Sequence, residues 1–329
     1  MTRSMIGKHR RIWALAAMFA LALLPATADA QSYPNRTIRM IVPSTAGSPT
    51  DVLARLLAQR LSLTIGQSVI IEDKPGAGGA IGTKAVIGAD PDGYTLLFTE
   101  GGKHLMTPAL YDNLTYDVVA DLAPVATVGG GSFVMVIAPD VPARTVNEFI
   151  AYAKANPNKL NFGFGQGTLP HMLGESLKAT TGADIASIPY KGGALAVADM
   201  LGGRIQLNFG TTATLLPLIQ QGRVRALAVT SAERSRDLPD VPTMAESGFP
   251  GLQLNFWMAV WAPAKTPQPI VDKLNAEINA SLKSPELIAS MTKTGFSPMP
   301  QSARAFEAQI AVEAPKWVAV AKTSGVKGD

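Results

Sequence analysis

Residues 37–99 alternate between short apolar runs and amphipathic stretches, and this alternation limits the folds open to the chain. The apolar runs at residues 37–43, 67–73 and 93–99 have the length of buried strands. Leucines recur at helical spacing after the first run, and a glycine turn opens another helical stretch after the second. The order strand, helix, strand, helix, strand predicts a parallel sheet covered by helices, which defines the α/β class.

A second round of such elements begins near Phe133. Further strands are predicted at residues 133–139, 160–165, 186–190, 204–210, 225–230 and 255–263. Further helices are predicted at residues 145–157, 169–182, 193–203, 214–222, 267–283, 284–295 and 303–325. We therefore expect two α/β lobes. Periodicity alone leaves open whether the late segments return to the first lobe.

Residues 1–30 have the pattern of a secretory signal peptide. Basic residues precede an apolar run at residues 12–24, Pro25 ends the run, and the Ala-Asp-Ala sequence at residues 28–30 fits the cleavage rule. The alternative is an N-terminal membrane anchor, for which the run is short. We expect cleavage near Gln31 and a periplasmic location. We expect no lipid anchor, because no cysteine follows the cleavage site.

Composition excludes several classes of function. The chain has no cysteine, which excludes a disulfide scaffold, a zinc–thiolate site and a cysteine nucleophile. Without residues 1–30 it holds 25 basic and 24 acidic residues. Because the basic residues form no cluster, we expect no nucleic-acid partner.

Catalytic and cofactor motifs are incomplete. The glycines of residues 76–82 have the wrong spacing for a dinucleotide site, and no acidic residue follows at the position that would bind a ribose. The segment at residues 88–95 has P-loop glycine spacing but no lysine, and the GxSxG and HExxH motifs are absent. We predict a binding protein rather than an enzyme, with no cofactor and no metal.

Two loops that lead from a strand into a helix carry the candidate binding residues. In the first, Ser48 fits the N-cap, Pro49 the first helical position and Asp51 the third, so capping alone explains them. A helix N-terminus also suits a carboxylate or phosphate, and the sequence leaves both interpretations open. In the second loop, Thr168 fits an N-cap, and His171 is either a ligand donor or a packed core histidine.

Several blocks of the chain resemble the substrate-binding proteins of tripartite tricarboxylate transporters, the Bug family. In family order they are residues 33–97, "DLAPVATV", "IPYKGGALAVADMLGGRI", "GRVRALAVTSAERSRDLPDVPTMAESGFPG" and "FWMAVWAPAKTP". The resemblance implies a periplasmic-binding-protein fold of type II, the Venus flytrap, with a mixed sheet flanked by helices in each lobe. Lobe 1 would be residues 31–132 plus 253–329, and lobe 2 residues 133–252.

The resemblance also implies a site and a partner. Family members hold one carboxylate of a small ligand between the two loops and deliver it to membrane permease subunits. The ligand-binding residues carried over by position are Ser44, Thr45, Ala46, Gly47, Ser48, Thr50, Gly165, Gln166, Gly167, Thr168 and His171. Further candidates are Phe164, Tyr190, Asn208 and Thr211. The turn at Lys191 and Gly192 would border the cleft. Weaker candidates are Thr99, Glu100 and His104.

Phe164 stands where the family often has serine. If its ring faces the cleft, the resemblance favours an aromatic carboxylate, of which terephthalate is one example. The alternative is that Phe164 packs into the second lobe. We expect a monomer that supplies a transporter. A second hypothesis is an extracytoplasmic carboxylate sensor that presents its bound state to a membrane signalling partner.

Overall fold

The computed structural model describes residues 33–111, 114–190 and 192–326, and its main compact unit begins at Arg36. The predicted signal peptide therefore lies outside the described residues. Within the described ranges, no helix is long and apolar enough to cross a membrane.

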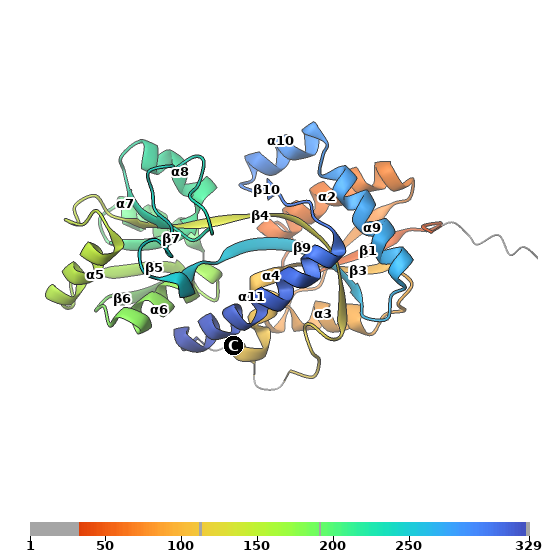
Figure 1. Cartoon of the computed structure of the whole chain (residues 1–329), viewed down its shortest axis with the longest axis horizontal. Coiled ribbons are helices and arrows are strands. Elements are labelled where there is room, and N and C mark those ends of the chain that lie inside the picture. Colours follow the sequence, from red (N-terminus) through yellow and green to blue (C-terminus); the bar gives the residue numbers. More distant parts are fainter. Residues whose placement is uncertain (1–32, 112–113, 191, 327–329) are drawn as a thin grey trace, which may run out of the picture. The chain divides into compact units, whose positions relative to one another are not determined.

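Ten strands form one mixed sheet (Figure 1). They are β1 (Ile38–Val42), β2 (Val69–Asp73), β3 (Thr95–Glu100), β4 (Leu122–Ile137), β5 (Asn161–Gly165), β6 (Ala186–Tyr190), β7 (Leu207–Thr211), β8 (Arg225–Val229), β9 (Asn255–Pro263) and β10 (Ser297–Pro298). The order is β2-β1-β3-β9-β4-β7-β5-β6, and β8 and β10 also pair with β4. Strands β2 and β3 flank β1 and run parallel to it. Strands β6 and β7 flank β5 in the same way, whereas β4 and β9 pair antiparallel.

Helices follow most strands, as the alternating pattern predicts. They are α2 (Pro49–Ile65), η1 (Ala77–Gly79), α3 (Ala80–Ile87), α4 (Gly101–Leu110), α5 (Val146–Ala155), α6 (Leu169–Thr181), α7 (Gly193–Leu201), α8 (Thr212–Gln220), η2 (Pro250–Leu252), α9 (Gln268–Ser281), α10 (Pro285–Lys293) and α11 (Ala303–Ser324). The predicted α/β class, with a mixed sheet flanked by helices, is confirmed.

The long strand β4 changes partners along its length. Its residues up to Ser132 pair with β9, and its residues from Phe133 onward pair with β7 and β8. A bond between the hydroxyls of Ser132 and Thr212, 2.9 Å apart, lies beside this change. Because one continuous strand serves both groups of strands, β4 ties the β1–β3 side of the sheet to the β5–β7 side.

Helix α11 makes a second connection between the two groups. It packs on α4, which follows β3, and on α6, which follows β5. The Ser176 hydroxyl of α6 donates a hydrogen bond to the Val320 carbonyl oxygen of α11 at 3.2 Å. The fully buried rings of Trp257 and Trp261 of β9 and Phe306 of α11 form a cluster with centroids 5.0–6.4 Å apart. Aromatic burial of this extent contributes strongly to the free energy of folding.

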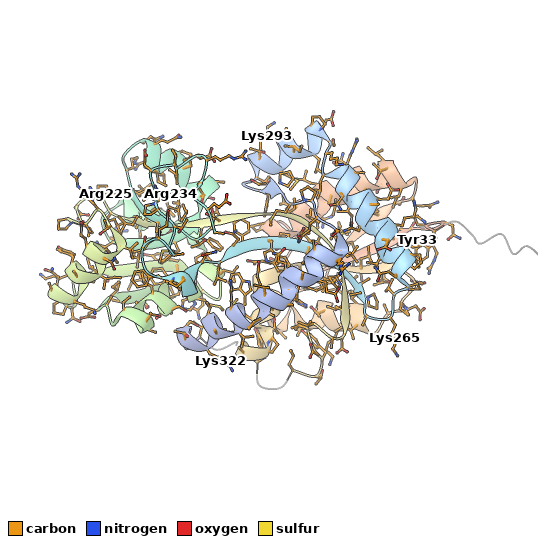
Figure 2. All side chains as sticks on the ribbon, viewed as in Figure 1. Tyr33, Arg225, Arg234, Lys265, Lys293 and Lys322 are labelled. Atoms are coloured by element: carbon orange, nitrogen blue, oxygen red, sulfur yellow. The ribbon has the colours of Figure 1, made fainter. Side chains whose placement is uncertain are left out.

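Arginines fix the loops around β8 (Figure 2). The Arg225 guanidinium donates to the carbonyl oxygens of Val141 and Ala143, both at 2.9 Å. Arg234 pairs with Glu246 at 3.0 Å. The first of these contacts joins β8 to the segment that precedes α5, so the strand order does not depend on sheet hydrogen bonds alone.

The sequence patterns missed helix α4. It opens on two glycines and contains Pro108, all poor helix formers. The glycines are required by packing: a Cβ atom at Gly101 would lie 2.0 Å from the Trp257 ring, and one at Gly102 would lie 2.7 Å from the Trp317 ring. Tertiary contacts therefore override the weak local propensity.

The patterns also placed the start of β4 too late, at Phe133 instead of Leu122. Three consecutive glycines in residues 129–131 indicate a loop by local rules. In the structure they allow close approach of neighbouring backbone, since a Cβ atom at Gly130 would lie 2.3 Å from the Phe256 carbonyl oxygen of β9. Glycine in a strand commonly marks such an approach.

A glycine in α6 gives a test of the core packing. A Cβ atom at Gly174 would lie 2.0 Å from the buried Phe162 ring. We expect Gly174→Ala to lower the free energy of unfolding by about 1–3 kcal/mol, because overpacking forces the ring out of place. Gly251→Ala is the matched control, since nothing lies within 4 Å of its added Cβ. Equal urea midpoints for the two variants would contradict the packing described.

Candidate ligand-binding site

The loop between β1 and α2 is held by capping bonds. The Asp51 amide donates to the Ser48 hydroxyl at 3.3 Å, and the Gly47 amide donates to an Asp51 carboxylate oxygen at 2.7 Å. Arg55 pairs with the same carboxylate at 2.7 Å. Burial acts to raise the pKa of Asp51, but the bonds from Arg55 and Gly47 outweigh it and the pKa is lowered. The Asp51 charge is thus paired within the chain.

This pairing leaves donors free at the start of α2. In the described part of the chain, the amides of Thr45, Ala46 and Thr50 have no hydrogen-bond acceptor, and the Ser44 hydroxyl has no partner. Thr50 is buried, Ser44 is half-buried, and Thr45 and Ala46 are exposed. Unpaired amides at a helix N-terminus carry partial positive charge and suit an anion. Of the predicted residues here, Gly47 and Ser48 use their amide and hydroxyl groups, respectively, to bond Asp51 within the loop.

The second loop, between β5 and α6, uses most of its amides internally. The Gln166 amide donates to the Tyr190 carbonyl oxygen at 3.1 Å, and the Thr168 amide to the Gly165 carbonyl oxygen at 3.3 Å. The Gly167 amide donates to His171 Nδ1 at 3.4 Å. What this loop offers a ligand is therefore mainly side chains: the exposed Gln166 amide group and the half-buried His171 ring.

His171 is held as a neutral donor. Because Nδ1 accepts the Gly167 amide proton, the ring proton lies on Nε2, which is left to donate. Burial lowers the pKa of His171, so the ring stays neutral near pH 7. The ring stacks on Phe164 with centroids 3.9 Å apart and an interplanar angle of 3°. The two interpretations of His171 thus describe one arrangement, a packed ring with one nitrogen available.

Phe164 itself faces the core. Its side chain is 3% exposed and lies 4.9 Å from the Phe162 ring as well as against His171. The sequence left open whether the Phe164 ring faces the cleft or packs into the protein. In the structure the ring is packed beside β5 and α6. Phe164 supports His171 from behind and does not present its ring at the surface.

Three other predicted residues have structural bonds. The Tyr190 hydroxyl donates to Asp199 at 2.7 Å. The buried Asn208 amide group donates to the Gly163 carbonyl oxygen at 2.7 Å, and Thr211 caps α8. Lys191 lies outside the described residues, and Gly192 caps α7 without a side-chain bond. The structure therefore does not bring Tyr190 and Thr211 forward as free polar groups, whereas the buried Oδ1 of Asn208 has no hydrogen-bond partner among the described residues.

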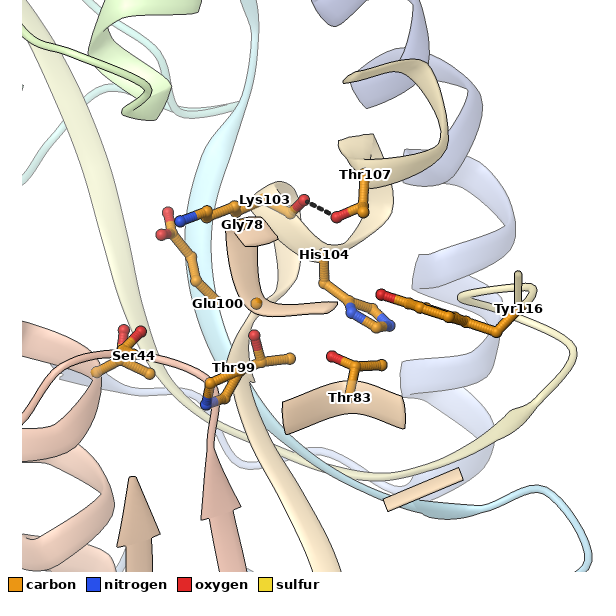
Figure 3. Close-up of a pocket in the computed structure, with 12 residues that line it drawn as sticks. Ser44, Gly78, Thr83, Thr99, Glu100, Lys103, His104, Thr107 and Tyr116 are labelled. Carbon is orange, nitrogen blue, oxygen red and sulfur yellow. Dashed lines mark hydrogen bonds between the residues drawn. The ribbon is translucent and has the colours of Figure 1, made fainter. Parts of the chain in front are cut away.

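A pocket lies beside the first loop, at the carboxyl ends of β1 and β3 (Figure 3). Its walls come from the first loop and α2, the glycine turn and α3, the end of β3 with α4, and the segment after α4. The lining residues are Pro43, Ser44, Thr50, Gly78, Gly79, Thr83, Thr99, Glu100, Lys103, His104, Thr107 and Tyr116. Five of the lining residues, Ser44, Thr50, Thr99, Glu100 and His104, are among the candidates predicted from the sequence, whereas Lys103 and Thr107 are not. The helical spacing of residues 100, 103, 104 and 107 is the signal that would have found them.

His104 is neutral in this pocket. Its Nε2 lies 3.0 Å from the Val118 carbonyl oxygen, which can only accept, so the ring proton lies on Nε2. Burial lowers the pKa of His104 to about 4. The ring also lies 5.1 Å from Trp261, which anchors it to the aromatic cluster under α11. His104 therefore adds no positive charge to the pocket near pH 7.

Glu100 is the unusual group of the pocket. It is the last residue of β3 and the N-cap residue of α4, but its side chain makes no capping bond. No described residue donates a hydrogen bond to its carboxylate. Burial raises the pKa of Glu100 to about 7, and the charge of Lys103 opposes this shift only in part. Near neutral pH this carboxyl group exchanges its proton readily.

The raised pKa of Glu100 predicts a pH-dependent effect on stability. In the folded chain Glu100 holds its proton more tightly than in the unfolded chain, so stability falls as pH rises from about 4.5 through about 7. Glu100→Gln removes this cost. At each pH, the comparison is the unfolding free energy of the variant minus that of the parent. We expect this difference to be ~1–3 kcal/mol more favourable to the variant near pH 8 than near pH 4.

Urea unfolding at the two pH values measures this effect. Glu307→Gln, at an exposed position on α11, is the matched control and should shift stability equally at both. A Glu100→Gln effect that is the same near pH 4 and pH 8 would show that Glu100 is not perturbed by burial.

Comparisons with known proteins identify the class to which this fold and these loops belong. A family model described as the tripartite tricarboxylate transporter family receptor matches residues 53–326. Protein BugT of Bordetella pertussis is 38% identical over 323 residues, covering 96% of this chain and 98% of that protein. The chain belongs to the tripartite tricarboxylate transporter receptor family.

Two solved structures agree with this membership. The periplasmic binding protein BugD is 37% identical, with a TM-score of 0.70 over 90% of this chain and 100% of that one. Rpa4515 from R. palustris, solved with adipate, is 34% identical, with a TM-score of 0.72 over 90% of this chain and 99% of that one. The fold of the chain is that of these binding proteins, and the predicted Bug-family resemblance is confirmed.

Proposed function

We propose that this chain is a periplasmic solute-binding protein that captures a small carboxylate and delivers it to a tripartite tricarboxylate-type permease. The observation that carries the proposal is the set of unpaired amides at the start of α2, beside the free Ser44 hydroxyl. Such donors bind a carboxylate well because they are already oriented and the nearby Asp51 charge is paired. Family membership and the adipate seen in Rpa4515 support the ligand class.

The binding motion we propose is closure of two lobes. Lobe 1 would be residues 31–132 plus 253–329, and lobe 2 residues 133–252. The change of β4 partners between Ser132 and Phe133 supports this division. In the closed state His171 Nε2 and the Gln166 side chain would add donors to a ligand held at the first loop. The ligand would thus shift an open–closed equilibrium by binding the closed form better.

We further propose two candidate ligands, an aromatic carboxylate and an aliphatic dicarboxylate. An aromatic carboxylate such as terephthalate would stack on the His171 ring, which Phe164 already supports from the other side. An aliphatic dicarboxylate would use the same donors without stacking. The proposed setting is the periplasm, reached through the predicted signal peptide of residues 1–30, and the proposed working form is a monomer without enzymatic activity.

A thermal-shift screen tests the proposed function. The mature chain, residues 31–329, is unfolded, refolded and mixed with butyrate, hexanoate, benzoate, succinate, adipate, terephthalate and citrate. Binding to the folded state raises the melting temperature; ligand at about 100 times its dissociation constant adds roughly 2.7 kcal/mol. No rise with any of these carboxylates, from folded and ligand-free protein, would contradict carboxylate capture.

The free hydroxyl of the first loop gives a sharper test. We expect Ser44→Ala to weaken the binding of a carboxylate found in the screen by about tenfold or more, because a hydrogen bond to a charged group contributes roughly 1.5–3 kcal/mol. Isothermal titration calorimetry measures the loss. Ser290→Ala is the control, since that hydroxyl donates only to the Glu286 carbonyl oxygen of its own helix. Equal affinities for the two variants would place the carboxylate elsewhere.

A further inference from the structure

We propose that the Glu100–Lys103 pocket is a subsite for the second carboxylate of a dicarboxylate ligand, and that filling it requires Glu100 to bind a proton. This inference rests on the proposed function, because it begins from a first carboxylate held at the amides of Thr45, Ala46 and Thr50. It adds a second subsite and a pH dependence to that function.

The pocket is continuous with the first loop. Ser44 and Thr50 line it, and both belong to the loop and helix start that carry the free donors. Because residues of α4 line the same pocket, a ligand anchored there by one carboxylate can extend toward α4. In Figure 3 the tips of the Glu100 and Lys103 side chains point the same way, away from His104 and Tyr116. A second functional group of the ligand would therefore meet these two side chains.

The charges in the pocket decide which group fits. Lys103 is the cation among the described lining residues, and His104 is neutral because burial lowers its pKa to about 4, although the bond to the Val118 carbonyl oxygen acts in the opposite direction. The other titratable lining group is Tyr116, and burial raises its pKa, so it is neutral too. The first loop, α2 and α3 contribute only uncharged lining residues. Among the described lining residues, Glu100 and Lys103 are thus the two charges that a ligand meets.

Lys103 attracts a carboxylate, whereas an ionised Glu100 repels one. Two carboxylates that share a buried site cannot both stay ionised at low cost, so one of them takes up a proton. We expect Glu100 to take up this proton, since burial already raises its pKa to about 7 and no described residue donates a hydrogen bond to its carboxylate. The protonated carboxyl group then donates to the ligand carboxylate, and Lys103 balances the remaining charge.

Proton binding by Glu100 makes dicarboxylate affinity depend on pH in a defined direction. Because the bound state holds one proton more than the free state, affinity for a dicarboxylate falls as pH rises above about 7. We expect adipate to bind at least about tenfold more weakly near pH 8.5 than near pH 6.5. Calorimetry in buffers of different ionisation enthalpy should show uptake of about one proton per adipate bound near pH 8.

Two variants assign the effect to the pocket. Glu100→Gln keeps a donor without a titratable proton, so adipate should bind it with nearly the same affinity at both pH values. Glu307→Gln is the control and should keep the pH dependence of the parent. Lys103→Met should weaken adipate binding by about tenfold but leave hexanoate, which lacks the second carboxylate, nearly unchanged. Melting temperatures confirm that each variant is folded.

The outcomes separate this inference from the proposed function. Adipate or terephthalate binding that is independent of pH, or pH dependence that survives Glu100→Gln, would overturn the inference and leave carboxylate capture intact. Binding of monocarboxylates such as hexanoate or benzoate without binding of adipate or terephthalate would do the same. If none of these compounds binds near either pH value, both the inference and the proposed function fail.

Discussion

The pairing of β4 with different partners at its two ends is the constraint on which the rest of the structure depends. Up to Ser132 the strand belongs with β9, and from Phe133 it belongs with β7 and β8. Both candidate loops leave the carboxyl ends of strands in these two groups, the first after β1 and the second after β5. In open α/β sheets ligands bind at such strand ends. Strand β4 therefore connects the two groups of strands that carry the candidate loops.

The two loops have unequal roles. The first retains free amides because Asp51 is satisfied by Gly47 and Arg55, which leaves the partial charge of the helix end available. In the second loop most amides form hydrogen bonds within the loop or to Tyr190. This loop offers a ligand the neutral His171 ring, whose proton lies on Nε2. One loop is thus suited to hold the charge of a ligand, and the other to add hydrogen bonds that depend on ligand shape. The Glu100 pocket extends the first loop and not the second.

Sequence patterns predicted most elements of the fold and the position of both loops. They succeeded where local signals agree with the structure, as at Ser48 and Thr168, which both cap helices. They failed at α4 and at the start of β4, where glycines are required by the buried tryptophans and by the β9 backbone. Since Lys103 and Thr107 lie on α4, the pocket could not be assembled without that helix. The burial of Phe164 depends on its contacts with Phe162 and His171, which no local pattern contains.

The central claim is that a ligand carboxylate binds the free amides at the start of α2. Amide proton and nitrogen NMR shifts of isotope-labelled mature protein, recorded during titration with adipate and with terephthalate, test it most directly. We expect the amide protons of Thr45, Ala46 and Thr50 to move downfield as they become bonded, while that of Gly47, already bonded to Asp51, moves little. Saturable binding that leaves these three amides unchanged would contradict the account.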